Sequence, residues 1–326
     1  MAQRMAMPSI TKTLAAGFNL VAENIYLIFL PVLIDLTIWL GPKIRVYELL
    51  SENVLQLINN ISQTAPEALL VQLKTLEDVA IAALGQTNVF GAIGLFPLSV
   101  PSLLAGSSTI VSPLANSKIS ELHSILTLLL VGFGLILIGT VLGCFYYSII
   151  AQKSAVQPFK LTLERFLKQL LNAFIMIMAL ILGLILLMIP ISCVTTVFAL
   201  LSPALAQIIL FIILMLTAWL IIPIFFSIHG VFLGANAIQS FKLSFNLSKW
   251  FSSPTSFFLI SMLVISQGLN IIWVIPEVDS WLLLIGIAGH AFISTALIAS
   301  SFILYQKYLI WITENEELLT KGIIRK

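Results

Sequence analysis

Long apolar runs with very few charges constrain this chain more than any other feature. Only 9% of its 326 residues are charged and 60% are hydrophobic, whereas roughly a quarter of the residues of a soluble domain are charged. The bilayer accepts helices or closed barrels, because every backbone polar group there needs a partner within the protein. The runs lack the alternation of barrel strands, so the sequence predicts an all-α, polytopic membrane protein.

Six of the apolar runs are long enough to be transmembrane helices, which need about 20 residues to cross. The first run follows Lys12 without a small-residue cleavage site, so we expect an uncleaved first span. The predicted spans cover about residues 24–40, 122–150, 173–191, 203–228, 255–275 and 281–304.

Residues 43–120 form one long connection, in which the apolar spacing predicts two amphipathic helices instead of a globular domain. The second helix is preceded by Thr64-Ala65-Pro66-Glu67, which has the spacing of a capping box. The apolar stretch 88–107 is interrupted by glycine and proline residues. We therefore expect this stretch to be re-entrant or to lie on the surface, and not to span the membrane.

Three amphipathic segments, here called elbows, precede pairs of spans. YYSI at 146–149 matches FFSI at 225–228, and FKLTL at 159–163 matches FKLSF at 241–245. These matches predict an internal repeat of one elbow and two spans used three times, with the first copy enlarged by the long connection. The predicted elbows cover residues 9–21, 153–171 and 234–250.

The distribution of Lys and Arg predicts the orientation in the membrane. Twelve of the 16 lie on the side of the termini and elbows, which the positive-inside rule places in the cytoplasm, with the region 43–120 outside. The cytoplasmic set is Arg4, Lys12, Lys153, Lys160, Arg165, Lys168, Lys242, Lys249, Lys307, Lys321, Arg325 and Lys326, and the external set is Lys43, Arg45, Lys74 and Lys118.

The third elbow resembles a known family. Its segment from Asn236 to Ser244, NAIQSFKLS, is similar to the cytoplasmic "alanine, x, x, x, serine, x, x, leucine" elbow of six-helix bacterial inner-membrane proteins. The membrane domain of membrane-anchored glycerophosphodiester phosphodiesterases typifies that family. The resemblance implies a plasma (inner) membrane location. Only a short tail follows the sixth predicted span, so we expect no hydrolase domain and carry over no phosphodiesterase activity.

Five polar residues lie in the outer halves of predicted spans, where their cost makes them candidates for function. One interpretation is an outward-facing polar pocket in which an aspartate and a histidine titrate as a pair. The alternative is structural: the aspartate reaches water or backbone groups of the stretch 88–107, and the histidine bonds a neighbouring helix. The five residues are Asp35, Gln207, Gln267, Asn270 and His290.

Five basic residues of the second and third elbows are candidate contacts for lipid headgroups. Either they bind anionic headgroups specifically or they serve as general anchors at the interface. These residues are Lys160, Arg165, Lys168, Lys242 and Lys249.

Motifs for catalysis and for metal binding are not found in the sequence. We therefore expect no catalytic residues, no metal ion and no cofactor, although a lone histidine in a span, such as His290, is compatible with haem or pigment ligation. The net charge of +2 does not favour a nucleic-acid partner. We expect membrane lipids as partners, together with other membrane-protein subunits or further copies of this chain.

Two functions remain open on these grounds. The leading hypothesis is a non-enzymatic scaffold, assembly factor or accessory subunit of a membrane complex, which uses the external amphipathic region to cover a partner. The alternative is a transporter or lipid-handling protein that uses the outward-facing polar pocket. An enzyme is the third hypothesis.

Overall fold

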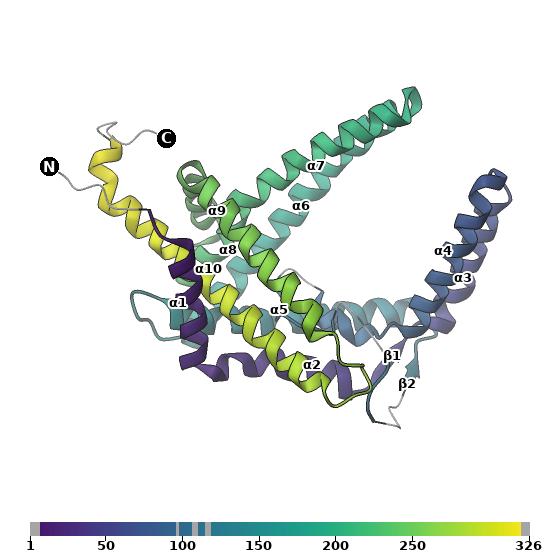
Figure 1. The fold of residues 1–326 in the computed structure, drawn as a ribbon, viewed down its shortest axis with the longest axis horizontal. Coiled ribbons are helices and arrows are strands. Elements are labelled where there is room, and N and C mark those ends of the chain that lie inside the picture. The colour runs from purple at the N-terminus through teal and green to yellow at the C-terminus, as the bar shows by residue number, and fades with distance from the viewer. Residues whose placement is uncertain (1–6, 96–97, 106–109, 115–118, 321–326) are drawn as a thin grey trace. The chain divides into compact units, whose positions relative to one another are not determined.

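The computed structural model describes residues 7–95, 98–105, 110–114 and 119–320 (Figure 1). Parts of the predicted stretch 88–107 therefore lie outside the described residues, as do Arg4, Lys118, Lys321, Arg325 and Lys326.

The structure is that of a multi-pass helical membrane protein. Among the described residues, five helical stretches are long and apolar enough to cross a membrane, and a sixth is obtained if two helices separated by a break are taken as one span. The five are α5 (Ile125–Ser154), α6 (Leu163–Leu201), α7 (Pro203–Phe225) continued by α8 (Ser227–Leu233), α9 (Ala237–Trp273) and α10 (Leu283–Thr320). The separated pair is α1 (Ile10–Glu23) and the stretch formed by η1 (Ile25–Ile28) and α2 (Phe29–Leu40).

The second and third predicted elbows are not separate helices, which corrects their boundaries. The elbow 153–171 combines the end of α5, a non-helical stretch and the start of α6, where Thr162 caps the helix by accepting a hydrogen bond from the Arg165 amide. The elbow 234–250 runs directly into its span within α9, which is bent at Phe251 just before Pro254. The two FKL matches consequently differ in structure, since 159–162 precedes a helix and 241–245 lies inside one. The threefold repeat stays a prediction.

The chain forms two compact units. The first comprises Met1–Glu23, Tyr147–Ile265 and Ala296–Lys326, and the second comprises Asn24–Tyr146 and Ser266–Thr295. Helices α5, α9 and α10 each contribute residues to both units.

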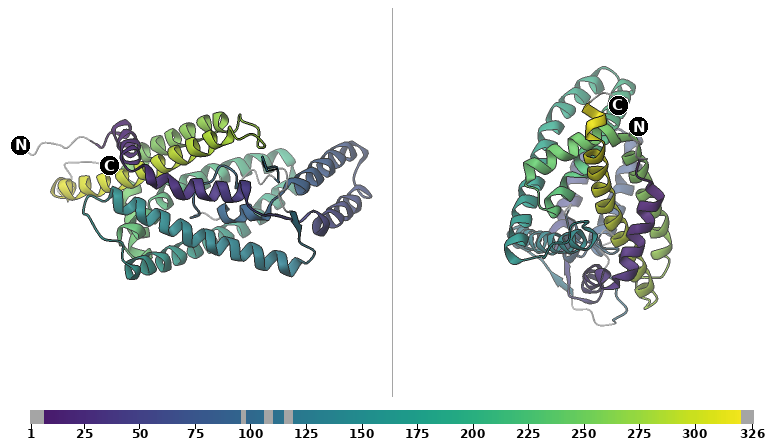
Figure 2. Two further views of the ribbon diagram at one scale, coloured as in Figure 1. Left: turned by 90° about the horizontal axis from the view of Figure 1, so that it is seen from below. Right: turned by 90° about the vertical axis from the view of Figure 1, so that its left-hand side faces the viewer.

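The first unit has a core of aromatic and aliphatic side chains from α9, α10 and the turn between α7 and α8. Phe251 of α9 stacks on Tyr308 of α10, with ring centroids 3.9 Å apart. Helices α6 and α7 pack side by side (Figures 1 and 2). Many of their apolar side chains are exposed, as expected for lipid-facing helices. The core cluster consists of Phe226, Leu247, Phe251, Phe258, Leu304, Tyr305, Tyr308 and Trp311.

The second unit contains the long connection 43–120, where two amphipathic helices lie side by side as α3 (Tyr47–Ser62) and α4 (Glu67–Gln86) (Figure 1). The capping-box prediction is wrong. Helix α4 begins behind Pro66 without a side-chain cap, and the Thr64 hydroxyl donates backwards to the Ile61 carbonyl over 3.2 Å.

The structure agrees with the predicted all-α class except for one small β-sheet in this unit, which was not predicted. Strand β1 (Lys43–Arg45) pairs in parallel with β2 (Ile119–Glu121), and Arg45 forms an ion pair with Glu121. The pairing joins the two ends of the connection and satisfies backbone groups that lie outside helices.

Candidate functional site

Asp35 is the most deeply buried of the five polar candidates. Helix α2 holds its side chain at 0% exposure. Its Oδ1 accepts hydrogen bonds from the Ser102 hydroxyl at 2.5 Å and the Leu104 amide at 3.0 Å, and its Oδ2 accepts one from the Leu103 amide at 3.0 Å. The carboxylate thus satisfies backbone donors of a non-helical segment that has no ladder of its own.

This segment, residues 98–105, is called here the inner segment. Most of its side chains are buried, and it follows the short 3-10 helix η2 (Val89–Gly94). Its hydrogen bonds to Asp35 agree with the structural interpretation, in which the aspartate reaches backbone groups of the stretch 88–107.

The other four polar candidates do not share a hydrogen-bond network with Asp35 in the described part of the chain. Gln207, in the first unit, and Gln267, in the second, are exposed. Asn270 Oδ1 and His290 Nε2, both in the second unit, are buried atoms without a hydrogen-bond partner among the described residues. A shared polar pocket stays a prediction.

Lys43 is a buried charged residue. In the sequence analysis it was used only in the count of basic residues and was not identified as part of a site. It is 0% exposed, and its Nζ donates to the Ile38 carbonyl at 2.6 Å and the Trp39 carbonyl at 2.8 Å. These are orphan carbonyls at the end of α2, so the ammonium group caps the helix that carries Asp35. Burial lowers the pKa of Lys43 to about 8.

Stability is expected to rise with pH between about 8 and 10.5 because of Lys43. In this range the unfolded chain, with the ordinary lysine pKa of 10.5, binds a proton that the folded protein has released. Below about pH 8 both states hold the proton and the contribution becomes constant. The measurement compares the thermal midpoint of the wild type with that of Lys43→Met across this range in one detergent. Parallel profiles of the two proteins would contradict the assignment.

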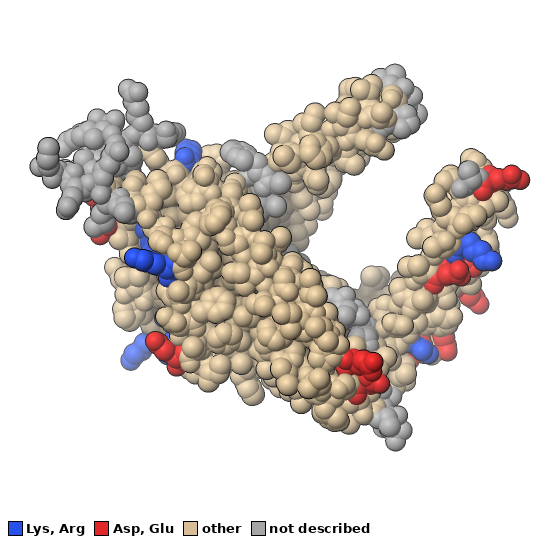
Figure 3. Space-filling model, viewed as in Figure 1, with Lys and Arg blue, Asp and Glu red and all other residues tan. Residues whose placement is uncertain are grey.

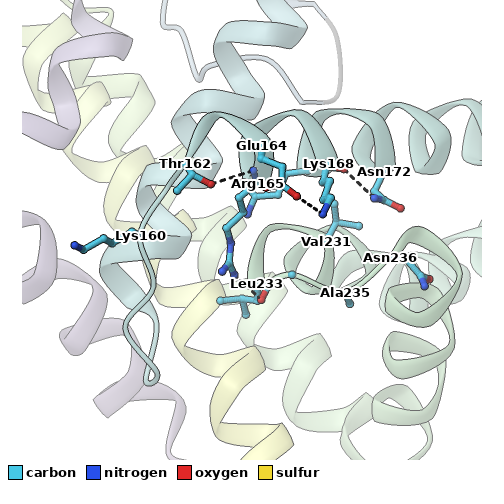
Figure 4. A pocket seen from close by; sticks show the side chains of 12 residues that line it. Lys160, Thr162, Glu164, Arg165, Lys168, Asn172, Val231, Leu233, Ala235 and Asn236 are labelled. Carbon is cyan, nitrogen blue, oxygen red and sulfur yellow. Dashed lines mark hydrogen bonds and ion pairs between the residues drawn. The ribbon is translucent and has the colours of Figure 1, made fainter.

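A cavity of about 610 Å³ in the first unit lies between the start of α6 and the turn that joins α8 to α9 (Figure 4). It brings together three of the five predicted headgroup contacts: Lys160, Arg165 and Lys168. The other two, Lys242 and Lys249, are exposed on α9 and do not line it. The complete lining is Lys160, Thr162, Glu164, Arg165, Lys168, Gln169, Asn172, Val231, Leu233, Gly234, Ala235 and Asn236.

Arg165 fixes one wall of this cavity. Its Nη2 donates to the Leu233 carbonyl at the end of α8 over 3.2 Å, and its guanidinium lies 3.6 Å from the centroid of the Phe159 ring. Gly234 ends α8 with a φ of 112°, a left-handed conformation suited to glycine, and its lack of a side chain leaves room for the Arg165 Nη2.

Two amides fix the rest of the wall. Gln169 Nε2 donates to the Phe232 carbonyl at 2.5 Å, and Asn172 Oδ1 accepts from the Ala237 amide at 2.9 Å. Helix α6 is therefore tied to the residues that begin α9. The sequence contains a signal for the start of α9 that the predicted elbow 234–250 did not use. Asn236 and Gln239 form a reciprocal capping box.

The described residues contain no group of three or more His, Cys, Asp or Glu side chains that could hold a metal ion. A buried histidine that was not among the candidates, His229, has Nδ1 3.0 Å from the Phe225 carbonyl and Nε2 2.7 Å from the Ser301 hydroxyl. Its ring therefore bonds to the protein itself.

The fold and these sites define a multi-pass helical membrane protein in which Asp35, Lys43 and His229 bond to the protein's own backbone or hydroxyl groups. No protein-family model, curated protein or solved structure matches the chain.

Proposed function

We propose that this protein is a non-catalytic scaffold, assembly factor or accessory subunit of a membrane complex. It lies in the plasma (inner) membrane with both termini and the basic cavity in the cytoplasm and with α3 and α4 outside. The observation that carries the proposal is the exposed apolar surface of the α3–α4 pair, which belongs to the region predicted to lie outside the spans.

Apolar side chains on both helices remain uncovered although the two helices pack on each other. Leu57 of α3 is 60% exposed, and Val71 and Val79 of α4 are 75% and 60% exposed. A large exposed apolar surface outside the bilayer is unusual for a soluble face and typically marks a contact with another molecule. Ile61, Leu69, Leu70 and Leu76 of the same two helices are exposed as well.

The charge of the pair favours a protein partner over the bilayer surface. Helices that lie on membranes carry Lys and Arg on their polar face, whereas Lys74 is the single basic residue of α3 and α4. Figure 3 shows acidic side chains along this pair of helices. We therefore infer a partner that presents an apolar surface edged with basic groups. The acidic residues of the pair are Glu48, Glu52, Glu67, Glu77 and Asp78.

Placing charge on this surface is expected to release the partner. The double variant Val71→Glu, Val79→Glu buries two carboxylates in the contact, so a protein that co-purifies stoichiometrically in mild detergent should be lost, with the membrane level of the chain unchanged. The double variant Gln72→Glu, Thr75→Glu is the matched control, because it adds the same number of carboxylates at exposed polar positions of the same helix. Purification of the wild type only as a monomer or self-oligomer, or equal loss of the partner in the control, would overturn the proposal.

A further inference from the structure

We propose that the cavity between α6 and the α8–α9 turn is a binding site for a phosphate group, carried by a lipid headgroup or by a small phosphorylated solute. The inference rests on the first unit alone, and it is independent of the partner surface on α3 and α4.

The charge on the cavity wall favours an anion. The lining residues include three cationic side chains, Lys160, Arg165 and Lys168, and one carboxylate, Glu164. Glu164 pairs with Lys168 over 2.6 Å, which occupies one of the three donors of that ammonium group. In Figure 4, Arg165 and Lys168 project from α6 toward the α8–α9 turn, while Lys160 points away. Arg165 and Lys168 are therefore the principal ligands, and Lys160 contributes at the rim.

Arg165 retains hydrogen-bonding capacity after its structural contact. Its Nη2 bonds to Leu233, but its buried Nε has no partner in the described part of the chain. A guanidinium held by a carbonyl on one side and an aromatic ring on another is fixed in orientation, which lowers the entropy cost of binding a phosphate oxygen.

Backbone dipoles add to this charge. Helix α6 begins at Leu163 and α9 begins at Ala237, and the residues that precede both helices, Thr162 and Asn236, line the cavity. The positive ends of both helices thus act on the same space in which Arg165 and Lys168 offer their donors. A phosphate matches this site better than a carboxylate, because it offers more oxygens to donors that come from several directions.

The exposed lysines of α9 provide the comparison that distinguishes a specific binding site from general attraction to anionic membranes. Lys242 and Lys249 lie in the same chain segment as part of the cavity but do not line it. General anchoring depends on net charge near the surface, so loss of any one lysine should have a similar effect. If the cavity is a specific site, loss of Lys168 should weaken ligand binding far more than loss of Lys242.

The test uses the full chain in nanodiscs of phosphatidylcholine, with or without phosphatidic acid, and in phosphatidylcholine nanodiscs with inorganic phosphate. Native mass spectrometry counts the retained anionic lipids, and the thermal midpoint reports stabilisation by either ligand. We expect Lys168→Gln to weaken the bound ligand about tenfold or more, as for loss of a charge-assisted hydrogen bond, and Lys242→Gln to leave it unchanged. Arg165→Lys, which keeps the charge but not the planar fork, should weaken it as well.

The two arms separate the sources of the phosphate. Retention of phosphatidic acid without an effect of inorganic phosphate assigns the site to a lipid headgroup, and stabilisation by inorganic phosphate assigns it to a soluble ligand. Equal weakening in Lys168→Gln and Lys242→Gln, or no retained lipid and no stabilisation in either arm, would overturn the proposal.

Discussion

Replacing Asp35 with alanine is expected to lower the free energy of unfolding by about 3–5 kcal/mol, since each of the donors it serves costs about 1–3 kcal/mol when buried without an acceptor. The donors are the Ser102 hydroxyl and the amides of Leu103 and Leu104. Both amides belong to buried residues, so water cannot readily replace the carboxylate as their acceptor. Unfolding in detergent, followed by helix content, measures the loss.

Two graded variants provide the controls for Asp35. Asp35→Asn keeps one acceptor oxygen and should cost less. Ser102→Ala removes the hydroxyl that donates to Asp35 and accepts from the Ala105 amide, and it should cost about 1–3 kcal/mol. A cysteine at Leu103, which is 7% exposed, reports the inner segment once the exposed Cys193 is replaced by serine: its labelling should speed up in Asp35→Ala. Unchanged stability and labelling in Asp35→Ala would show that the carboxylate is not structural, and would return it to the predicted polar pocket.

The sequence could identify Asp35 but could not decide its role. A charged residue in an apolar run is conspicuous by itself, whereas its partners are backbone amides, 68 and 69 residues away, that no side-chain pattern marks. The same limit applies to Lys43. A basic residue just after a span usually lies at the interface, and only the tertiary structure shows that this one is enclosed and caps α2.

The spans were easier to predict than the boundaries between elbows and spans. Hydrophobicity and length mark a span, but no helix-breaking residue separates the second elbow from its span, so α6 continues from Leu163 to Leu201. The strands β1 and β2 have three residues each and lie far apart in the sequence, which leaves no periodic signal.

The sequence identified the basic candidates by their charge, but only the tertiary structure shows which of them line the cavity. All five basic residues of the elbows satisfied the same criterion in the sequence, namely a position on the polar side of an amphipathic segment. Their separation into cavity-lining and exposed groups depends on the bond from Arg165 to Leu233 and on the start of α9, which are tertiary features.

Replacing Gly143 with alanine is expected to destabilise the protein by about 3 kcal/mol, at the upper end of the usual cost of overpacking. A Cβ at Gly143 would overlap the Leu98 carbonyl, and one at Gly139 would overlap the Ile93 carbonyl. Both obstacles are backbone atoms, which cannot rotate away as a side chain could. The Gly-xxx-Gly spacing of α5 therefore serves contact with η2 and the inner segment, which Asp35 holds from α2.

The same helix offers a matched control for this contact. A methyl group added at Gly132 or Gly134 of α5 would have nothing within 4 Å, so Gly134→Ala should leave the free energy of unfolding unchanged or raise it by up to about 1 kcal/mol through helix propensity. Unfolding of Gly143→Ala, Gly139→Ala and Gly134→Ala in one detergent measures the difference. Because the clash acts on the segment that Asp35 holds, combining Gly143→Ala with Asp35→Ala should cost less than the sum of the two single changes. Strict additivity would show that α2 and α5 act on the inner segment independently.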